Sequence, residues 1–465
     1  MTDLRALLTR TAGHVAAYRE AAGEAAVFPE VDLGAVRAAI GGPMPDGPAP
    51  AGQVIDQLVA AVEPAMVATT GPRYFGFVVG GALDAATAAD VLAVGWDQPA
   101  YNHLSSPASA VVEEVAGGWL AELFGLPGEV SFGFVTGAQG ANTVCLAAAR
   151  HKVLADAGWD VERDGLAGGP AITVVASQER HATIDRSLRL LGLGAGSVQA
   201  VPADGNGAID VAALGHVLAG KPAGPAIVCL QSGNVNTGAC DDLAAAVAVA
   251  HQYGAWAHVD GAFGLWAAAS PATRPLVAGI ETADSWGTDG HKWLNVPYDS
   301  GYAFCAHRDA HAAAMAYTAA YLVGTSPAAV RPPGDYVLES SRRARGFATW
   351  AALRELGRSG IAELVDRCCA LARRFAAQLA AIDGISVVND VVLNQVLVRF
   401  GDDDATTDRV IEAVQRSGQC WMGATTWHGQ RLMRISVSSW RTTEADVDRS
   451  VRAILAAARP RTQAR

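Results

Sequence analysis

The stretch ADSWGTDGHKWLNVPYDSGYAF, residues 283–304, decides the fold because its single lysine stands in apolar and aromatic company. No other lysine or arginine occurs in this run. Burying an unpaired ammonium group costs several kcal/mol, so Lys292 requires an explanation. Two interpretations stay open. Lys292 forms an ion pair with Asp289 or Asp299, or burial lowers its pKa so that the amine can attack a carbonyl group.

Composition narrows the class of protein. The chain has 465 residues, of which 51% are apolar and 17% charged, enough for a large domain with a substantial core and a smaller one. The net charge of −11 is spread along the chain, so no nucleic-acid or membrane partner is expected. Arg342, Arg343 and Arg345 form the only tight basic cluster and predict a solvated loop. Short apolar runs, the absence of a signal peptide and seven scattered cysteines favour a soluble cytoplasmic enzyme.

The sequence predicts three domains. Residues 1–72 form a helical arm with a Pro/Gly linker, which we expect to lie on a partner subunit. In residues 73–340, helical stretches alternate with the β-branched runs AITVVAS, AIVCLQS, AWAHVD and ADSWGT. This alternation predicts an α/β domain with a mostly parallel sheet and helices on both faces. Residues 341–465 predict a small α+β domain. Because ligands bind beyond the carboxyl ends of parallel strands, reactive residues should follow the strands.

A carboxylate and an amine follow two of these runs. AWAHVD ends at Asp260, which precedes Lys292 by 292 − 260 = 32 residues, about one βα unit. If the two strands are neighbours, both groups face one crevice. Taken alone, Asp260 is equally well a helix cap. Together they suggest pyridoxal phosphate (PLP), which forms a Schiff base with a lysine and needs an acidic partner for its ring nitrogen.

Other patterns support or weaken this interpretation. The stretch GFVTGAQGANTVCLAAAR provides a small-residue turn before a helix, and the N–H groups at a helix N-terminus bind phosphate without a lysine. Such a turn is weak evidence by itself. His181 follows the strand AITVVAS, where an imidazole could stack on a flat ring, although a lone histidine is usually unremarkable. No metal is predicted, because His258 and Asp260 lack a third ligand, and the G-x-S-x-G hydrolase motif is absent.

The motifs HVDGAFG (258–264) and DGHKWLNVPYDSG (289–301) carry a family resemblance, supported by SSPASAVVEEVAGGWLAELFGLP, SGNVNTGACD and SRRARGFATW. Over about residues 73–457 the chain resembles the group II PLP-dependent amino-acid decarboxylases, which act on aromatic amino acids, glutamate, histidine or diaminobutyrate. The resemblance implies the PLP-dependent transferase fold type I, with a seven-stranded sheet. It also implies a homodimer, with the active site near the interface, that converts an L-amino acid to an amine and CO2.

Alternatives to decarboxylation stay open. Another PLP reaction on the same fold is one class: transamination, decarboxylating aldehyde synthesis or aldolase/lyase cleavage. A scaffold protein that keeps the fold without PLP is another.

The resemblance also implies residue roles. Lys292 matches the lysine that carries the cofactor, and Asp260 matches the partner of the ring nitrogen. His181 matches a histidine that stacks on the ring, and Tyr321 matches a loop tyrosine that returns a proton to Cα. The other implied cofactor contacts are Ala138 and Gln139 at the phosphate, His291 and Asp289 beside it, Ala262 beneath the ring and Asn234 at the ring hydroxyl.

The chain departs from the family pattern at two places. Its phosphate loop reads TGAQGAN instead of paired glycines with Ser or Thr, and Val235 stands where Thr is usual.

Phe77 and Tyr101 are expected to line the substrate pocket, which favours an aromatic or bulky apolar side chain of the substrate. Ordinary core packing explains these two rings almost equally well. Arg73 could instead pair with an acidic substrate.

Overall fold

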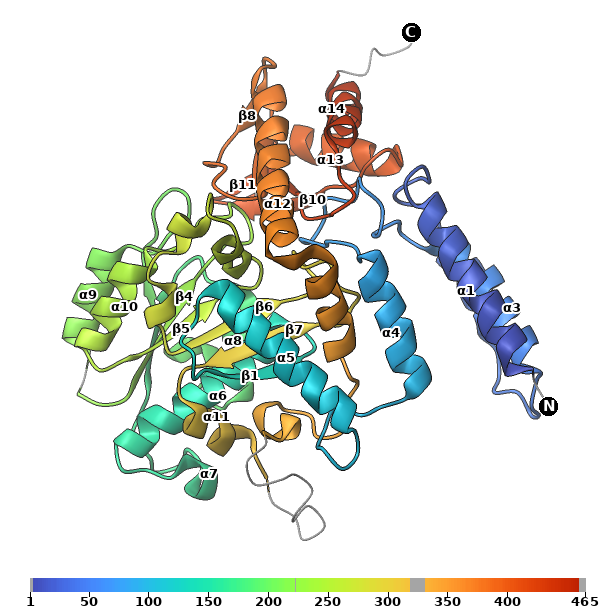
Figure 1. Ribbon diagram of the computed structural model, residues 1–465. Coiled ribbons are helices and arrows are strands. Elements are labelled where there is room, and N and C mark those ends of the chain that lie inside the picture. Colours follow the sequence, from blue (N-terminus) through green and yellow to red (C-terminus); the bar gives the residue numbers. More distant parts are fainter. Residues whose placement is uncertain (1–2, 222, 318–330, 460–465) are drawn as a thin grey trace. The chain divides into compact units, whose positions relative to one another are not determined.

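The structure is a computed structural model that describes residues 3–221, 223–317 and 331–459 (Figure 1). The chain forms two compact units. The first unit contains Met1–Val79, Arg373–Val388 and Val396–Arg465, and the second contains Gly80–Ala372 and Asn389–Gln395. Each unit therefore combines segments that are not contiguous in the sequence. The domain boundaries expected after residues 72 and 340 therefore stay a prediction.

The second unit is built on a seven-stranded sheet with the order β1-β7-β6-β5-β4-β2-β3. Strand β7 is antiparallel to both β1 and β6, and the pairs β6–β5, β5–β4, β4–β2 and β2–β3 are parallel. The mostly parallel sheet predicted from the alternating pattern is thus confirmed. The strands are β1 (Ser131–Val135), β2 (Thr173–Ser177), β3 (Val198–Val201), β4 (Ala226–Gln231), β5 (Trp256–Asp260), β6 (Ser285–Asp289) and β7 (Gly301–Cys305).

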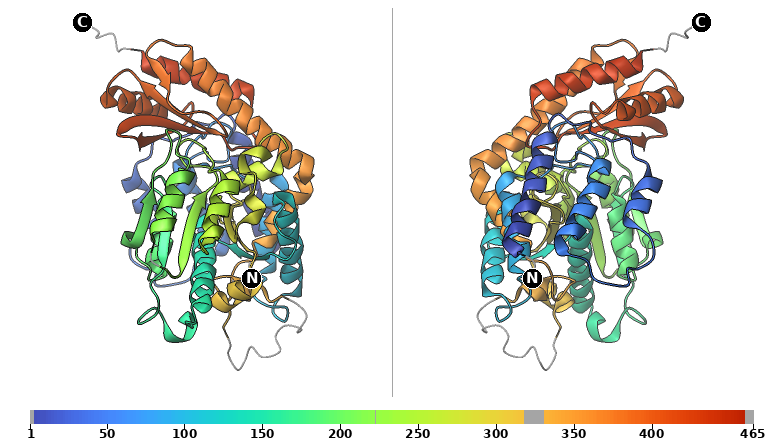
Figure 2. Two further views of the ribbon diagram at one scale, coloured as in Figure 1. Left: turned by 90° about the vertical axis from the view of Figure 1, so that its left-hand side faces the viewer. Right: turned by 90° about the vertical axis from the view of Figure 1, so that its right-hand side faces the viewer.

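Helices cover both faces of this sheet (Figures 1 and 2). The chain first moves outward from β1 to β3 and then returns through β4 and β5 to β6. Right-handed crossovers place the outward and returning helices on opposite faces. Accordingly, α6 (Ala138–Asp156) packs on α8 (Ala182–Leu190), and α9 (Val211–Gly220) packs on α10 (Leu243–Gln252). The other helices are α4 (Asp84–Trp96), α5 (Pro107–Phe124), α7 (Val161–Asp164), α11 (Arg308–Met315) and α12 (Gly346–Ala380), which is kinked at Gly357 and continues into the first unit.

The core of the second unit lies within the sheet. Strands β1, β4, β5, β6 and β7 are buried at every position, as expected when helices cover both faces. None of the seven cysteines, all of which lie in the described ranges, forms a disulfide, and six of them are buried. Across the described ranges, no helix has both the length and the apolar character needed to cross a membrane.

The first unit combines a four-stranded sheet with helices from both ends of the chain. The sheet order is β10-β11-β9-β8. Its strands are β8 (Ile385–Val387), β9 (Gln395–Phe400), β10 (Gly423–Trp427) and β11 (Gln430–Ser436). Its helices are α1 (Leu4–Ala21), α2 (Leu33–Ile40), α3 (Ala51–Val62), α13 (Asp404–Arg416) and α14 (Glu444–Ala458). Helices α1, α2 and α3 contain no buried residue, so their apolar side chains do not form an ordinary core.

The basic cluster at residues 342–345 is not the solvated loop that was expected. The Arg342 side chain is 2% exposed and donates to both carboxylate oxygens of Glu113, at 2.6 and 2.8 Å. Each arginine binds a carboxylate on a different element: Glu113 on α5, Asp90 on α4 and Asp299 in the loop before β7. The cluster therefore joins elements that are far apart in the sequence.

Candidate active site

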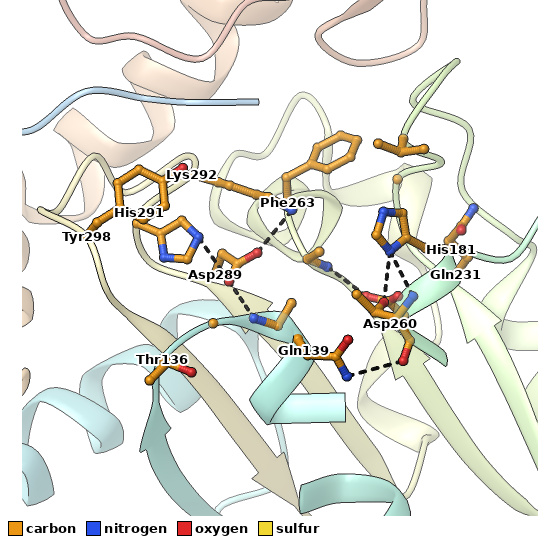
Figure 3. Close-up of a pocket in the computed structure, with 16 residues that line it drawn as sticks. Thr136, Gln139, His181, Gln231, Asp260, Phe263, Asp289, His291, Lys292 and Tyr298 are labelled. Carbon is orange, nitrogen blue, oxygen red and sulfur yellow. Dashed lines mark hydrogen bonds and ion pairs between the residues drawn. The ribbon is translucent and has the colours of Figure 1, made fainter. Parts of the chain in front are cut away.

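A cavity of about 360 Å³ lies at the carboxyl ends of β4, β5 and β6 (Figure 3). Strand β5 ends at Asp260, and β6 ends three residues before Lys292. The two strands are parallel neighbours, and both Asp260 and Lys292 line the cavity. One crevice therefore holds the carboxylate and the amine.

The Asp289 carboxylate joins three groups at one end of this cavity. One oxygen lies 3.0 Å from Nζ of Lys292. The other accepts a hydrogen bond of 2.5 Å from the backbone N–H of Ala138 and lies 3.4 Å from Nε2 of His291. Of the two ion-pair partners considered for Lys292, Asp289 is the one present, because Asp299 binds an arginine instead.

The imidazole of His291 is held in one orientation. Its Nδ1 accepts a 3.1 Å hydrogen bond from the Ser300 backbone N–H, so in the neutral ring Nε2 carries the proton and faces Asp289. The ring stacks on Tyr298 with 4.1 Å between centroids. Burial lowers the pKa of His291, which favours the neutral form. His291 is therefore a neutral donor at this end of the cavity.

Asp260 lies at the opposite end, with only 5% of its surface exposed. One of its oxygens accepts a 3.3 Å hydrogen bond from the Ala262 backbone N–H. Burial raises the pKa of Asp260, and the positive charges of His181 and Lys292 act in the other direction. A carboxylate in this position is stabilised by a cationic donor, and a protonated pyridine nitrogen is such a donor.

The first turn of α6 forms a cradle at the Asp289 end of the cavity. Gly137, Ala138 and Gln139 line the cavity, and Gly137 caps α6 without a side-chain hydrogen bond. A Cβ atom on Gly137 would come within 3.0 Å of both Asp289 and His291, so a larger residue would fill the cradle. The N-terminus of a helix attracts phosphate. With an amine, a buried acid and this helix end, the residues present fit PLP.

Two polar side chains attach α8 to the cavity wall. His181 caps α8, and its Nδ1 accepts a hydrogen bond from the Thr183 N–H at 3.3 Å. Figure 3 shows its ring above Asp260. The Gln139 amide donates to Oγ of Ser187 at 2.9 Å, so its side chain links α6 to α8. Any phosphate contact from residue 139 therefore falls to its backbone.

The cavity brings together most of the residues singled out in the sequence. Its lining includes eight of them: Lys292, Asp260, His181, Ala262, Ala138, Gln139, His291 and Asp289. Asn234 is not part of the lining. Its side-chain oxygen accepts from the N–H groups of Asn236 and Thr237, and its amide donates to the Glu179 carbonyl. These bonds hold a turn, and the adjacent Gly233 and Val235 line the cavity instead.

Three other described residues that the sequence singled out, Phe77, Tyr101 and Arg73, are not part of this lining. Phe77 belongs to the first unit, is 60% exposed and packs its ring on Trp421. Tyr101 shares a 2.9 Å hydrogen bond with the Tyr317 hydroxyl. Their substrate roles stay predictions. Tyr321 lies outside the described residues.

The polar partners of Arg73 lie within the first unit. It is 2% exposed, pairs with Asp446 at 3.2 Å and donates to the Gln419 carbonyl. This pairing removes the sequence argument that Arg73 binds an acidic substrate.

Sequence reasoning missed three prominent side chains of the cavity: Gln231, Phe263 and Tyr298. Each had a signal. Gln231 ends the run AIVCLQ, one strand away from Asp260, and Phe263 lies within HVDGAFG. Tyr298 belongs to the same stretch as Lys292. Strand-end position alone marks Gln231, since parallel strands end at the same edge of the sheet.

Comparison with known proteins identifies a family. The sequence model of the pyridoxal-dependent decarboxylase conserved domain matches residues 35–400. Tryptophan decarboxylase 1 of Oryza sativa is 27% identical over 94% of this chain and 90% of that protein. Phenylacetaldehyde synthase of Arabidopsis thaliana is 25% identical over 87% of this chain and 85% of that protein.

A solved structure shows the same fold. The crystal structure of Oryza sativa TDC with PLP and tryptamine matches with a TM-score of 0.90 and 24% identity. The match covers 98% of this chain and 97% of that one. The fold class predicted from the alternating pattern and the family resemblance is confirmed.

Proposed function

Because the chain belongs to the pyridoxal-dependent decarboxylase family, we propose that it removes the α-carboxylate of an aromatic L-amino acid, releasing CO2 and the amine. The family makes it a PLP-dependent carboxy-lyase. The observation that carries the proposal is the joint placement of Lys292, Asp260 and the α6 N-terminus around one cavity.

Each residue has a separate task. PLP, when bound, supplies an aldehyde that joins amines and a protonated ring that accepts the electron pair left by CO2. Lys292 provides the amine that holds the cofactor and later releases the product. Asp260 keeps a proton at the ring nitrogen, since its buried carboxyl is stabilised by a cationic donor. Ala138 and His291, whose donors face Asp289 in this structure, would bind the phosphate, and His181 would cover the ring and approach the substrate carboxylate.

The lining of the cavity supports an aromatic substrate. Phe263, Tyr298 and Val235 contribute apolar surface, and no described lining residue is an arginine. A dicarboxylic amino acid would need a cation for its second carboxylate. Lys292 and the histidines are already engaged with Asp289 or the cofactor site. The tryptophan decarboxylase relative also points to aromatic substrates.

The test is a competition among substrates. The purified holoenzyme is incubated with equal amounts of tryptophan, tyrosine, phenylalanine, glutamate and histidine, and amines, aldehydes and CO2 are quantified by mass spectrometry. We expect one aromatic amine with equimolar CO2. Preferential consumption of glutamate would overturn the substrate proposal, and products without CO2 would overturn decarboxylation.

A second outcome is favoured by two relatives, the phenylacetaldehyde synthases of Arabidopsis thaliana and of a Rosa hybrid cultivar. In that case CO2 is accompanied by aldehyde, ammonia and hydrogen peroxide, with O2 as the oxidant and water as the source of the aldehyde oxygen. We propose that Tyr321 determines the product by returning a proton to Cα. A Tyr321→Phe variant should then shift product from amine to aldehyde. Unchanged amine formation would remove this role from Tyr321.

The proposed active form is a cytoplasmic homodimer with its active site near the interface. Helix α4 presents exposed Val91, Val94 and Trp96, which supports association of two copies. Sedimentation of the holoenzyme at micromolar concentration should give a species of twice the 47.9 kDa chain mass. A single species at the chain mass would contradict the dimer.

A further inference from the structure

Gln231 lines the cavity and carries a buried hydrogen-bond donor, its side-chain Nε2, without a partner. The residue is 6% exposed, and its Nε2 lies out of solvent with no hydrogen-bond acceptor. Buried side-chain amides are normally paired, and leaving one unpaired costs more than an average hydrogen bond contributes. This donor therefore indicates a ligand acceptor in the cavity that Gln231 lines.

The backbone of Gln231 is fixed, so its side chain has a defined direction. Its N–H donates to Asp241 at 2.7 Å, and its carbonyl accepts from the Asp241 N–H at 3.0 Å. Gln231 is also the register partner of Asp260 across the parallel pair β4–β5. Residues in register on neighbouring strands point to the same side of a sheet. Gln231 and Asp260 therefore belong to the same end of the cavity.

The order of the strands indicates which atom of PLP would accept this hydrogen bond. The phosphate cradle at α6 lies by β6, on one side of Asp260, and Gln231 on β4 lies on the other side. In PLP, the phosphate arm and the phenolic oxygen occupy opposite edges of the ring. A ring whose nitrogen meets Asp260 and whose phosphate meets α6 would turn toward β4 the edge that carries its 2-methyl group and its phenolic oxygen.

We propose that Gln231 binds the cofactor by donating a hydrogen bond from Nε2 to the phenolic oxygen of PLP. Asn234, the residue that sequence reasoning placed there, has its amide committed to the Glu179 carbonyl. Val235 has no hydroxyl to offer, so Gln231 takes the role in this chain. The inference rests on the proposed function only in requiring that PLP is the cofactor.

The test uses spectroscopy and cofactor affinity rather than turnover. A donor to the phenolic oxygen favours its ionised form, which absorbs in the visible range, over the neutral form, which absorbs in the near ultraviolet. We expect Gln231→Leu to lower the visible-to-near-ultraviolet ratio of the holoenzyme about tenfold and to raise the Kd for PLP about tenfold. Gln231→Glu, which keeps the size of the side chain, should shift both quantities in the same direction.

The matched control is Asn234→Asp, which also exchanges one amide for a carboxylate but retains the oxygen that holds its turn. Its absorbance ratio and Kd should equal those of the unmodified protein, and circular dichroism confirms that each variant is folded. Unchanged values in both Gln231 variants, or a shift in Asn234→Asp alone, would overturn the inference. Absence of a visible band in the unmodified holoenzyme would instead overturn the proposed function, and the inference with it.

Discussion

Two pairs of opposite charges in the second unit differ in what surrounds them. In the arginine clamp, Arg342 and Glu113 are 2% and 0% exposed and share two hydrogen bonds. In the cavity pair, Lys292 is 18% exposed and shares the Asp289 carboxylate with the Ala138 N–H and His291. The Arg342–Glu113 pair is buried and bidentate, which is typical of a structural ion pair. The Lys292–Asp289 pair is partly exposed and its carboxylate has other partners, so the amine can leave Asp289 to bind the cofactor that we propose.

Replacing the cavity amine should have the largest effect. Lys292→Ala removes the group that holds the cofactor, so turnover should fall at least about a thousandfold. The free energy of unfolding should change little, because the amine is partly exposed and Asp289 keeps its other two partners. Activity assays and urea unfolding measure the two effects. If Lys292→Ala lost much of its stability but kept turnover, the Lys292–Asp289 pair would be structural, like the Arg342–Glu113 pair.

Breaking the clamp should have the opposite signature. Glu113→Gln leaves the Arg342 guanidinium buried without its counter-charge, which typically costs about 3–5 kcal/mol of stability. Urea unfolding followed by circular dichroism measures this loss. The visible absorbance of the holoenzyme should persist in the folded fraction. A change in unfolding free energy below ~1 kcal/mol would show that the clamp is not structural.

Asp241 sharpens the comparison because it is buried and its carboxylate accepts hydrogen bonds from backbone N–H groups. It accepts hydrogen bonds from the N–H groups of Ile209 and Gln231. Burial raises its pKa from 3.8 to about 7. The folded protein thus binds this proton more tightly than the unfolded chain. The associated stability is fully present below pH 3.8 and is lost as pH rises through about 7, by as much as ~4 kcal/mol.

The measurement for Asp241 is a difference between two proteins. The unfolding free energies of the unmodified protein and of Asp241→Asn are compared at several pH values, since asparagine cannot ionise. Between pH 3.8 and about 7, the unmodified protein should lose stability relative to Asp241→Asn as the pH rises. A constant difference would show that Asp241 does not titrate there.

Asp289→Asn should have the smallest effect and should increase an affinity. The carboxylate occupies the Ala138 N–H, which belongs to the phosphate cradle, and its charge repels phosphate. Asparagine keeps an acceptor for that N–H without the charge. The Kd for PLP should fall about tenfold, whereas the Kd for pyridoxal, which has no phosphate, should not change. Equal changes for both compounds would place the effect of Asp289 away from the phosphate.

The sequence was sufficient to predict the sheet and the placement of Asp260 and Lys292 around one cavity. Asp260 and Lys292 follow consecutive parallel strands, and the spacing of one βα unit brings such residues to the same edge. His181 and the first turn of α6 reached the cavity for the same reason. A residue that follows a parallel strand lies at the carboxyl edge of the sheet, so local sequence patterns that locate strands also locate such residues.

Contacts over long sequence distances could not be predicted in this way. Arg342 and Glu113 are separated by 229 residues, and nothing in the basic cluster announces a buried carboxylate. The contact to the ring hydroxyl that was expected of Asn234 is proposed for Gln231 instead, because two N–H groups of a turn bind the Asn234 oxygen and its amide donates to the Glu179 carbonyl. Which amide faces the cavity depends on that turn, and the pattern SGNVNTGACD does not display its hydrogen bonds.

The central claim is that Lys292 carries the cofactor in this cavity. Reduction of the holoenzyme with borohydride, followed by peptide mass spectrometry, tests it most directly. We expect one pyridoxyl phosphate adduct, located on Lys292, and none in Lys292→Ala. An adduct on another lysine, or no adduct in a holoenzyme that decarboxylates amino acids, would contradict the account.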